Sequence, residues 1–370
     1  MKKKRMANME LLRIIAMLMV VMLHYLSKGM QLPAMTGPQG VRGVLAWGME
    51  SLAIVAVNVY MLISGYFLTE GRFRTGRLIQ LICQVLFYSI LVTAVLLCTG
   101  QLVLSDLTIY ELLQVLFPLE MNQYWFATAY CVLYLLTPIL RSAVHHMGQK
   151  QLKITIFLLL LVFSVNKSLL PFRLETDQKG YDVLWFLCVF LVAAYIRLYG
   201  IKWFDKAKKG FAGYLVCCAG MFVWILGMHF FYLKTGRLGD VLINAHNYNH
   251  ILNLVASVCL FYGFYHLKLK EGFFSRWVLK LAPYTFGVYL LHEQLFVRYL
   301  WPKWLGAENV ASAAEFLGNA LVSVAVVFTA GIIVDMIRAA LFALAGRVLN
   351  KGRIARLLDQ IDEGLKGEES

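Results

Sequence analysis

The sequence predicts an all-α, polytopic integral membrane bundle of about ten transmembrane helices, and two observations support this prediction. The first is composition: 60% of the 370 residues are hydrophobic and only 15% are charged, with a mean hydropathy of +0.67. Soluble domains are roughly half apolar and about a quarter charged, so a water-soluble globule could not bury this much apolar surface. The second is that basic residues cluster in alternate connections between the apolar segments.

Apolar segments long enough to cross a bilayer, which takes about 20 residues in a helix, recur along the chain. The ten candidates span roughly 8–27, 48–69, 78–99, 121–140, 153–170, 182–200, 211–233, 249–267, 283–301 and 316–345. Backbone groups in lipid must be hydrogen-bonded internally, so these spans are expected to be helical. The shorter stretch 103–119 carries Asp106 and Glu111, which favours an interfacial or loop helix. We therefore predict one membrane domain over 1–350 and a cytoplasmic tail over 351–370.

The formal net charge of +14 indicates a membrane topology rather than nucleic-acid binding. Basic clusters lie at 2–5, 72–77, 141–153, 202–209, 268–280 and 347–356, in every second connection. Loops rich in Lys and Arg stay on the cytoplasmic side, so both termini are predicted in the cytoplasm and the protein in the plasma (inner) membrane. Anionic lipid headgroups are expected partners. The first apolar segment is too long for a signal peptide and predicts an uncleaved helix.

Arg13 and His24 share one face of the first predicted helix. They are eleven residues apart, which is about 20° past three full turns and about 16 Å along the axis. Ionisable residues inside a membrane segment usually mark a functional site. The alternatives are that Arg13 extends to the cytoplasmic interface and that His24 is a satisfied interfacial histidine.

The loop after the second predicted helix carries Arg72, Arg74 and Arg77. Three guanidinium groups this close together could hold phosphates through bidentate hydrogen bonds. Taken alone, the loop favours the other interpretation, an ordinary inside-positive anchor. Ser64, just before this loop, is expected either to let helices approach closely or to line a cavity.

Further polar and aromatic residues lie in other apolar segments. Trp125 is typical of an interfacial aromatic belt, whereas Tyr289 and His292 are neighbours on one helix face and predict a buried site with Glu293 near mid-bilayer. His246 and His250 have a spacing that suits a metal on a helix, but the segment between them is expected to be an exposed loop. We predict no metal site, and none of the seven cysteines is spaced for a metal or a disulfide framework.

Three stretches together resemble the acyltransferase 3 family of multi-pass membrane acyltransferases. They are the Arg13-to-His24 pattern, the ISGYFL segment with its basic loop containing Arg74-x-x-Arg77, and YTFGVYLLH ending at His292. The YWF of 124–126 followed by LLTPIL fits as well. The resemblance implies transfer of an acyl group, usually acetyl, from coenzyme A to a hydroxyl of an envelope sugar or lipid-linked glycan. It implies a catalytic pair, Arg13 and His24, and a donor-handling role for Arg74 and Arg77, with no tightly bound cofactor.

The two lines of reasoning give one hypothesis. Arg72, Arg74 and Arg77 would hold the phosphates of acyl-coenzyme A, and His24 would act as the general base on the acceptor hydroxyl or carry the acyl group transiently. Ser64, Trp125, Tyr289 and His292 are expected to line the cavity. A multi-pass transporter of an envelope glycan or lipid precursor is the alternative, although no inverted repeat is visible. The sequence does not fix the acceptor, the acyl group or the oligomeric state.

Overall fold

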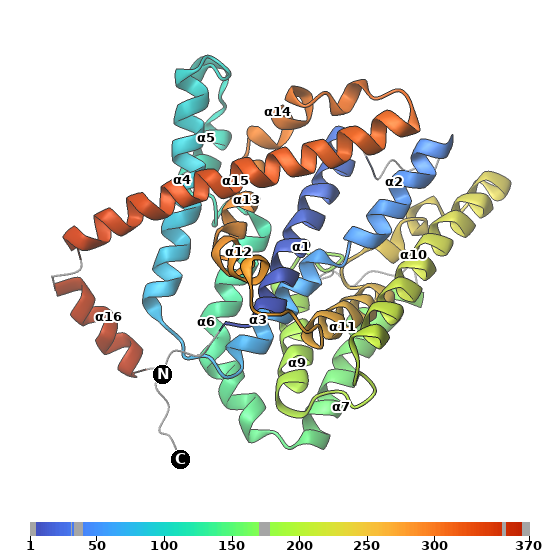
Figure 1. The fold of residues 1–370 in the computed structure, drawn as a ribbon, viewed down its shortest axis with the longest axis horizontal. Coiled ribbons are helices and arrows are strands. Elements are labelled where there is room, and N and C mark those ends of the chain that lie inside the picture. Colours follow the sequence, from blue (N-terminus) through green and yellow to red (C-terminus); the bar gives the residue numbers. More distant parts are fainter. Residues whose placement is uncertain (1–4, 31, 33–39, 170–177, 350–352, 365–370) are drawn as a thin grey trace.

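Every regular element in the described part of the chain is a helix, as the composition predicts. The computed structural model describes residues 5–30, 32, 40–169, 178–349 and 353–364. The helices, labelled in Figure 1, are α1 (Ala7–His24), α2 (Gly40–Ala53), α3 (Ala56–Leu68), α4 (Thr75–Cys98), α5 (Ile109–Leu116), α6 (Trp125–His146), α7 (Gln149–Leu160), α8 (Asn166–Leu169), α9 (Val183–Tyr199), α10 (Ala207–Thr235), α11 (Ile251–Tyr265), α12 (Phe273–Leu281), α13 (Thr285–His292), α14 (Val297–Trp304), α15 (Ala313–Leu349) and α16 (Arg353–Gly364).

The length and apolar character of the helices confirm a polytopic membrane bundle. Among the described residues, seven helical segments are long and apolar enough to cross a bilayer: Ala7–Gly29, Gly40–Leu68, Thr75–Cys98, Trp125–His146, Gln149–Ser168, Ala207–Thr235 and Ala313–Ala345. The helix α9 is apolar but shorter. The predicted count of about ten is therefore not confirmed. The predicted loop helix over 103–119 appears as α5, which begins with a capping box between Thr108 and Glu111.

The helix α1 lies at the centre of the bundle (Figure 1), where it contacts α2, α3, α11, α12, α13 and α15. Its large side chains Met9, Leu12 and Met17 are almost completely buried, because neighbours surround the helix on several sides. Beyond His24 the helix continues as a π-helical turn, Tyr25–Gly29. Such π-helical turns often occur at functional sites.

The predicted helix over 283–301 is broken, and a side chain explains the break. The helix α13 ends at His292 and α14 begins at Val297. The Gln294 side chain accepts hydrogen bonds from the backbone amides of Phe296 (2.9 Å) and Val297 (3.1 Å) and so caps α14. The break leaves His292 and Glu293 at the end of a helix instead of in the middle of one.

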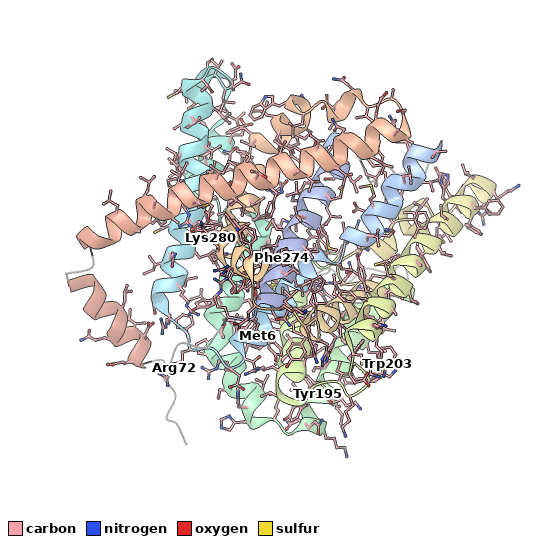
Figure 2. The ribbon with its side chains drawn as sticks, viewed as in Figure 1. Met6, Arg72, Tyr195, Trp203, Phe274 and Lys280 are labelled. Carbon is pink, nitrogen blue, oxygen red and sulfur yellow. The ribbon has the colours of Figure 1, made fainter. Side chains whose placement is uncertain are left out.

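The described parts of the basic segments lie at one end of the bundle. Hydrogen bonds link these segments and the helix ends next to them: Arg5 donates to the Leu279 carbonyl, Arg141 to the Thr69 carbonyl, Arg197 to the Tyr66 hydroxyl, Gln149 to the Tyr195 hydroxyl, and Thr75 to the Asp362 carboxylate. Figure 2 shows Arg72, Tyr195 and Trp203 along the same edge. The helix α5 lies at the opposite end of α4 (Figure 1). We call the first of these ends the basic end.

Candidate active site

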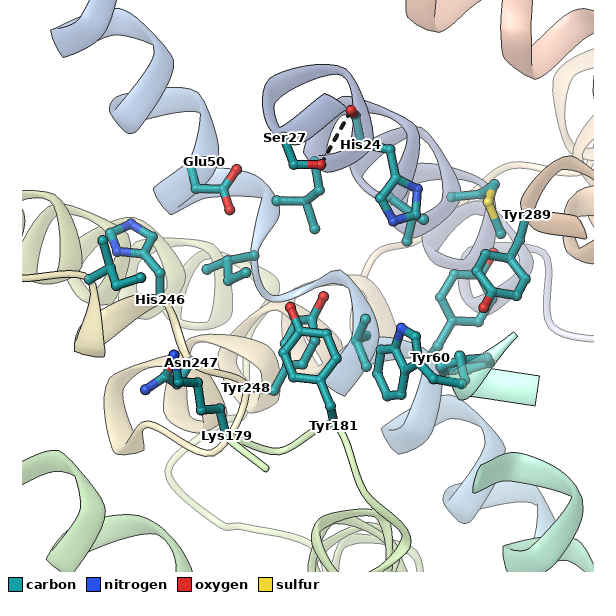
Figure 3. Close-up of a pocket in the computed structure, with 18 of the residues that line it drawn as sticks. His24, Ser27, Glu50, Tyr60, Lys179, Tyr181, His246, Asn247, Tyr248 and Tyr289 are labelled. Carbon is teal, nitrogen blue, oxygen red and sulfur yellow. Dashed lines mark hydrogen bonds between the residues drawn. The ribbon is translucent and has the colours of Figure 1, made fainter. Parts of the chain in front are cut away.

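A pocket of about 280 Å³ opens inside the bundle beside α1. Its walls come from α1, α2, α3, α6 and α13, and from the segments 179–181 and 243–248. In Figure 3 the imidazole of His24 lies on one side of this space and the Glu50 carboxylate on the other, with Tyr181 and Tyr248 between them. A cavity lined by aromatic rings and a few polar groups is the usual form of a ligand site.

His24 is held by a chain of two hydrogen bonds. Its Nδ1 lies 2.7 Å from Nε2 of His292, and the His292 Nδ1 lies 2.5 Å from the Val288 carbonyl oxygen. The sequence predicted both histidines as site residues, but their direct contact across 268 positions is visible only in the structure. His24 lines the pocket itself, whereas His292 is buried behind it.

Glu293 places a carboxylate beside this pair. Its Oε1 lies 3.4 Å from the His24 Nδ1 and has no hydrogen-bond partner among the described residues. Its Oε2 lies 3.8 Å from Nη1 of Arg298. The Arg298 Nη2 also donates to the backbone carbonyls of Glu293 (2.8 Å) and Gln123 (3.1 Å), which fixes the guanidinium next to the carboxylate.

The opposite end of the pocket is polar. Glu50 of α2 and the side chains of Lys179, His246 and Asn247 reach it from three segments (Figure 3). The His246 Nε2 lies 2.8 Å from the Ser51 hydroxyl. Burial lowers the pKa of His246 to about 3, with a smaller contribution from His250, so this imidazole is neutral at physiological pH.

Three aromatic rings form the floor between the two ends. The Trp125 ring centroid lies 4.6 Å from that of Tyr181 and 5.8 Å from that of Tyr248, and the two tyrosine rings are 4.5 Å apart. Asn58 of α3 fixes this floor, because its amide donates to the Tyr248 carbonyl (2.8 Å) and accepts from the Trp185 indole (2.9 Å). Gly180 permits the close approach: it has φ +86°, and a Cβ there would collide with the backbone of Asn249.

The segment between His246 and His250 was expected to be an exposed loop, and this prediction is wrong. His246, Tyr248, Asn249 and His250 are all at most 8% exposed. The segment re-enters the bundle because its polar groups find internal partners, such as Asn58, Ser51 and the Lys179 carbonyl, which accepts from the Tyr248 amide. His250 caps α11 through its Nδ1, which accepts from the Leu252 amide.

The remaining predicted residues lie between the pocket and the basic end. Arg13 is paired with Glu10 at 2.7 Å and does not line the pocket. Ser64 interacts with the Tyr130 hydroxyl, and the positive charge of Arg13 acts on the same hydroxyl. The Tyr60 hydroxyl donates to the Arg13 carbonyl at 2.9 Å, and Tyr60 lines the pocket. Arg13, Ser64, Tyr130 and Tyr60 therefore form a polar column, which we name the tyrosine column.

The three predicted donor-binding arginines, Arg72, Arg74 and Arg77, are exposed at the basic end and lie outside the pocket. The Arg74 backbone is fixed by the Tyr134 hydroxyl, which accepts from its amide at 3.0 Å. Asp362 of α16 accepts from both the amide and the hydroxyl of Thr75, each at 2.7 Å. The predicted tail therefore includes a helix docked beside these arginines, while 351–352 and 365–370 lie outside the described residues.

Several pocket residues were not predicted. Glu50 could have been found from sequence, since a carboxylate at the start of the apolar segment 48–69 is costly in a membrane. Lys179, Tyr181 and Tyr248 lie in connections that carry no periodic pattern, so only the fold brings them to the site.

Comparison with known proteins gives one match. The model of the acyltransferase 3 family, described as an acyltransferase domain, matches residues 6–336 of the 370-residue chain. No curated protein matches the chain, and no solved structure matches it. The family match confirms the resemblance that the ordered motifs indicate.

Proposed function

The chain belongs to the acyltransferase 3 family and is a membrane acyltransferase, and on that premise we propose a specific reaction for it. The protein moves an acyl group, acetyl being the family default, from acyl-coenzyme A to a hydroxyl of a cell-envelope sugar or lipid-linked glycan. His24 is the general base of this transfer.

One observation supports this role most directly: His24 presents its imidazole to the pocket (Figure 3) while its Nδ1 is engaged by His292. The Nε2 atom makes no hydrogen bond to the described residues and is the nitrogen available to a substrate. Imidazole is suited to this task because it can gain and lose a proton near neutral pH.

The reaction balances with His24 as the only proton carrier. Nε2 takes the proton of the acceptor hydroxyl as its oxygen attacks the thioester carbonyl. The new C–O bond replaces the C–S bond when the tetrahedral intermediate collapses, and the thiolate leaves. His24 then returns the proton to the sulfur, which gives an ester and free coenzyme A.

The donor is proposed to enter from the basic end. Arg74 and Arg77, with Arg72, bind its phosphates there. His24 lies about 25 Å from the start of α1 at that end, so an extended donor is needed to bridge the distance. The tyrosine column lies along this route and offers hydroxyl and guanidinium groups to the amides of the pantetheine arm.

The acceptor is proposed to occupy the pocket beyond His24. The aromatic floor offers ring faces to an apolar surface of the ligand, and Glu50 and Asn247 offer hydrogen bonds to a hydroxyl-rich one. The segments 179–181 and 243–248 belong to connections that the charge pattern assigns to the outside. The acceptor would therefore arrive from the outer face of the plasma membrane, with the termini in the cytoplasm.

The decisive experiment replaces His24 and measures acyl transfer by purified protein. His24→Ala is expected to lower the rate by about a hundred- to ten-thousand-fold, as loss of a general base does, with unchanged protein in the membrane. His146→Ala is the matched control, since His146 is exposed at the end of α6. Normal acetylation of the envelope glycan by the His24 variant would refute the proposal.

A further inference from the structure

Two residues behind His24 determine which of its ring nitrogens carries the proton and what charge lies beside the ring. The first of them is His292. A carbonyl oxygen can only accept, so the contact with Val288 at 2.5 Å requires the proton of neutral His292 to be on its Nδ1. Its Nε2 is then a lone pair, and the 2.7 Å contact requires His24 to donate from Nδ1. The chain of bonds thus leaves the lone pair of His24 on Nε2, toward the pocket.

The second residue is Glu293, whose carboxylate meets the same Nδ1 from another side. When Nε2 takes a proton, His24 becomes a cation inside a bundle of low polarity, where a lone charge is costly. Oε1 of Glu293 lies 3.4 Å from Nδ1 and is buried without a hydrogen-bond partner among the described residues. The Nδ1 proton already bonds His292, so the carboxylate acts through its charge. At this distance its negative charge attracts the imidazolium and lowers the cost of forming a cation in the bundle.

The other charged groups facing His24 do not supply this compensation. Lys28, on the next turn of the same helix, and Arg298 of α14 are both cations that act on His24. Arg298 is fixed to Glu293 through the 3.8 Å ion pair and the bond to its backbone carbonyl. Glu293 therefore separates a permanent cation from the cation that forms during the reaction.

From these contacts we infer that His292 and Glu293 are positioning residues for the base. His292 fixes the tautomer of His24, and Glu293 stabilises the imidazolium that forms when the acceptor hydroxyl loses its proton. This inference rests on the proposed role of His24. The same division of labour, in which a buried partner on Nδ1 orients an imidazole and balances its charge, is effective in hydrolases with a Ser-His-Asp triad.

The test compares kcat and KM in purified protein for Glu293→Gln, which keeps the shape and removes the charge. We expect kcat to fall about tenfold to a thousandfold, which is a smaller loss than the one expected for His24→Ala. KM for acyl-coenzyme A should be unchanged. Glu293→Asp should recover part of kcat. Glu120→Gln, at an exposed position, is the matched control and should keep wild-type kcat.

His292 is tested by two replacements that differ in one property. His292→Gln keeps an oxygen that can accept from the His24 Nδ1 and should retain more kcat than His292→Leu, which cannot accept. Thermal unfolding of each purified variant shows whether it is folded, and Glu293→Gln remains informative if both His292 variants unfold. Full kcat in Glu293→Gln and equal kcat in the two His292 variants would overturn the inference.

The outcomes separate this inference from the proposed function. If His24→Ala is inactive but Glu293→Gln and the His292 variants are fully active, His24 remains the base and the positioning roles are wrong. If His24→Ala is fully active, the proposed function itself fails.

Discussion

Glu50 is the residue whose side chain best distinguishes the two ends of the pocket. Its carboxylate faces the space from α2, on the side away from His24 (Figure 3). A hydrogen bond of this kind contributes about 0.5–1.5 kcal/mol, which corresponds to roughly two- to tenfold in affinity. The residue is far from the arginines of the basic end, so its effect should be confined to one substrate.

We therefore expect Glu50→Gln to raise KM for the acceptor by about two- to tenfold, with KM for acyl-coenzyme A unchanged. Steady-state kinetics with each substrate varied in turn measures both values. Glu120→Gln again serves as the control. A variant that binds the donor more weakly and the acceptor normally would place the acceptor elsewhere.

Single residues also show how far sequence reasoning reaches. His24, Trp125 and Tyr289 were predicted and line the pocket, because a polar or aromatic side chain at an apolar segment stands out in the sequence. The contact of His24 with His292 was not predicted, since it joins residues 268 positions apart. Such a contact depends on how α1 and α13 pack, which no local pattern encodes.

At the scale of elements, a buried ion pair within α15 joins this helix to α4. Asp335 is 0% exposed and accepts from Arg338 at 2.8 Å, from Gln84 of α4 at 2.9 Å and from the Tyr88 hydroxyl at 3.0 Å. A Cβ on Gly287 of α13 would collide with this carboxylate. The close packing of α13, which carries His292, therefore depends on the position of Asp335.

Removing one member of a buried pair leaves an uncompensated charge and typically costs about 3–5 kcal/mol. Asp335→Ala should therefore lower the unfolding temperature of the purified protein and the amount in the membrane. Replacing both partners, as in Asp335→Leu with Arg338→Met, should restore part of the stability. A melting curve of Asp335→Ala identical to that of the wild type would show that the pair is not a stabilising element.

The arginine loop before α4 gives a second prediction at this scale. Arg74→Ala combined with Arg77→Ala should raise KM for acyl-coenzyme A about tenfold or more, because two charge-assisted contacts to phosphate are lost. Lys150→Ala with Lys153→Ala removes two exposed cations from the same end and should leave KM unchanged. Equal effects of the two pairs would indicate general attraction of the donor rather than a phosphate site.

Helices were predicted better than the interruptions between them. Apolar length alone indicated α1, α4, α6 and α10, because the bilayer imposes it. The break at Glu293 was missed, since it depends on the Gln294 side chain, which caps α14 and also donates to the Thr93 hydroxyl. A polar residue that stabilises a break looks the same in sequence as one that faces a cavity.

At the scale of the whole molecule, the proposed reaction needs the donor and the acceptor to approach from opposite sides. The described basic segments share one end of the bundle. The pocket is lined by 179–181 and 243–248, which belong to the connections between the basic ones. Positive loops stay in the cytoplasm, which is why we propose that the basic end faces the inside. This assignment can be tested without measuring activity.

Single cysteines placed in a background without the seven native ones report the side of each loop. Gly76→Cys and Gly148→Cys, at open positions of the basic end, should react with a membrane-impermeant thiol reagent only after cells are permeabilised. Ser105→Cys, exposed before α5, should react in intact cells. Labelling of position 76 in intact cells would place the arginine loop outside, where cytosolic coenzyme A cannot reach it, because a polyphosphorylated donor does not cross the hydrocarbon layer unaided.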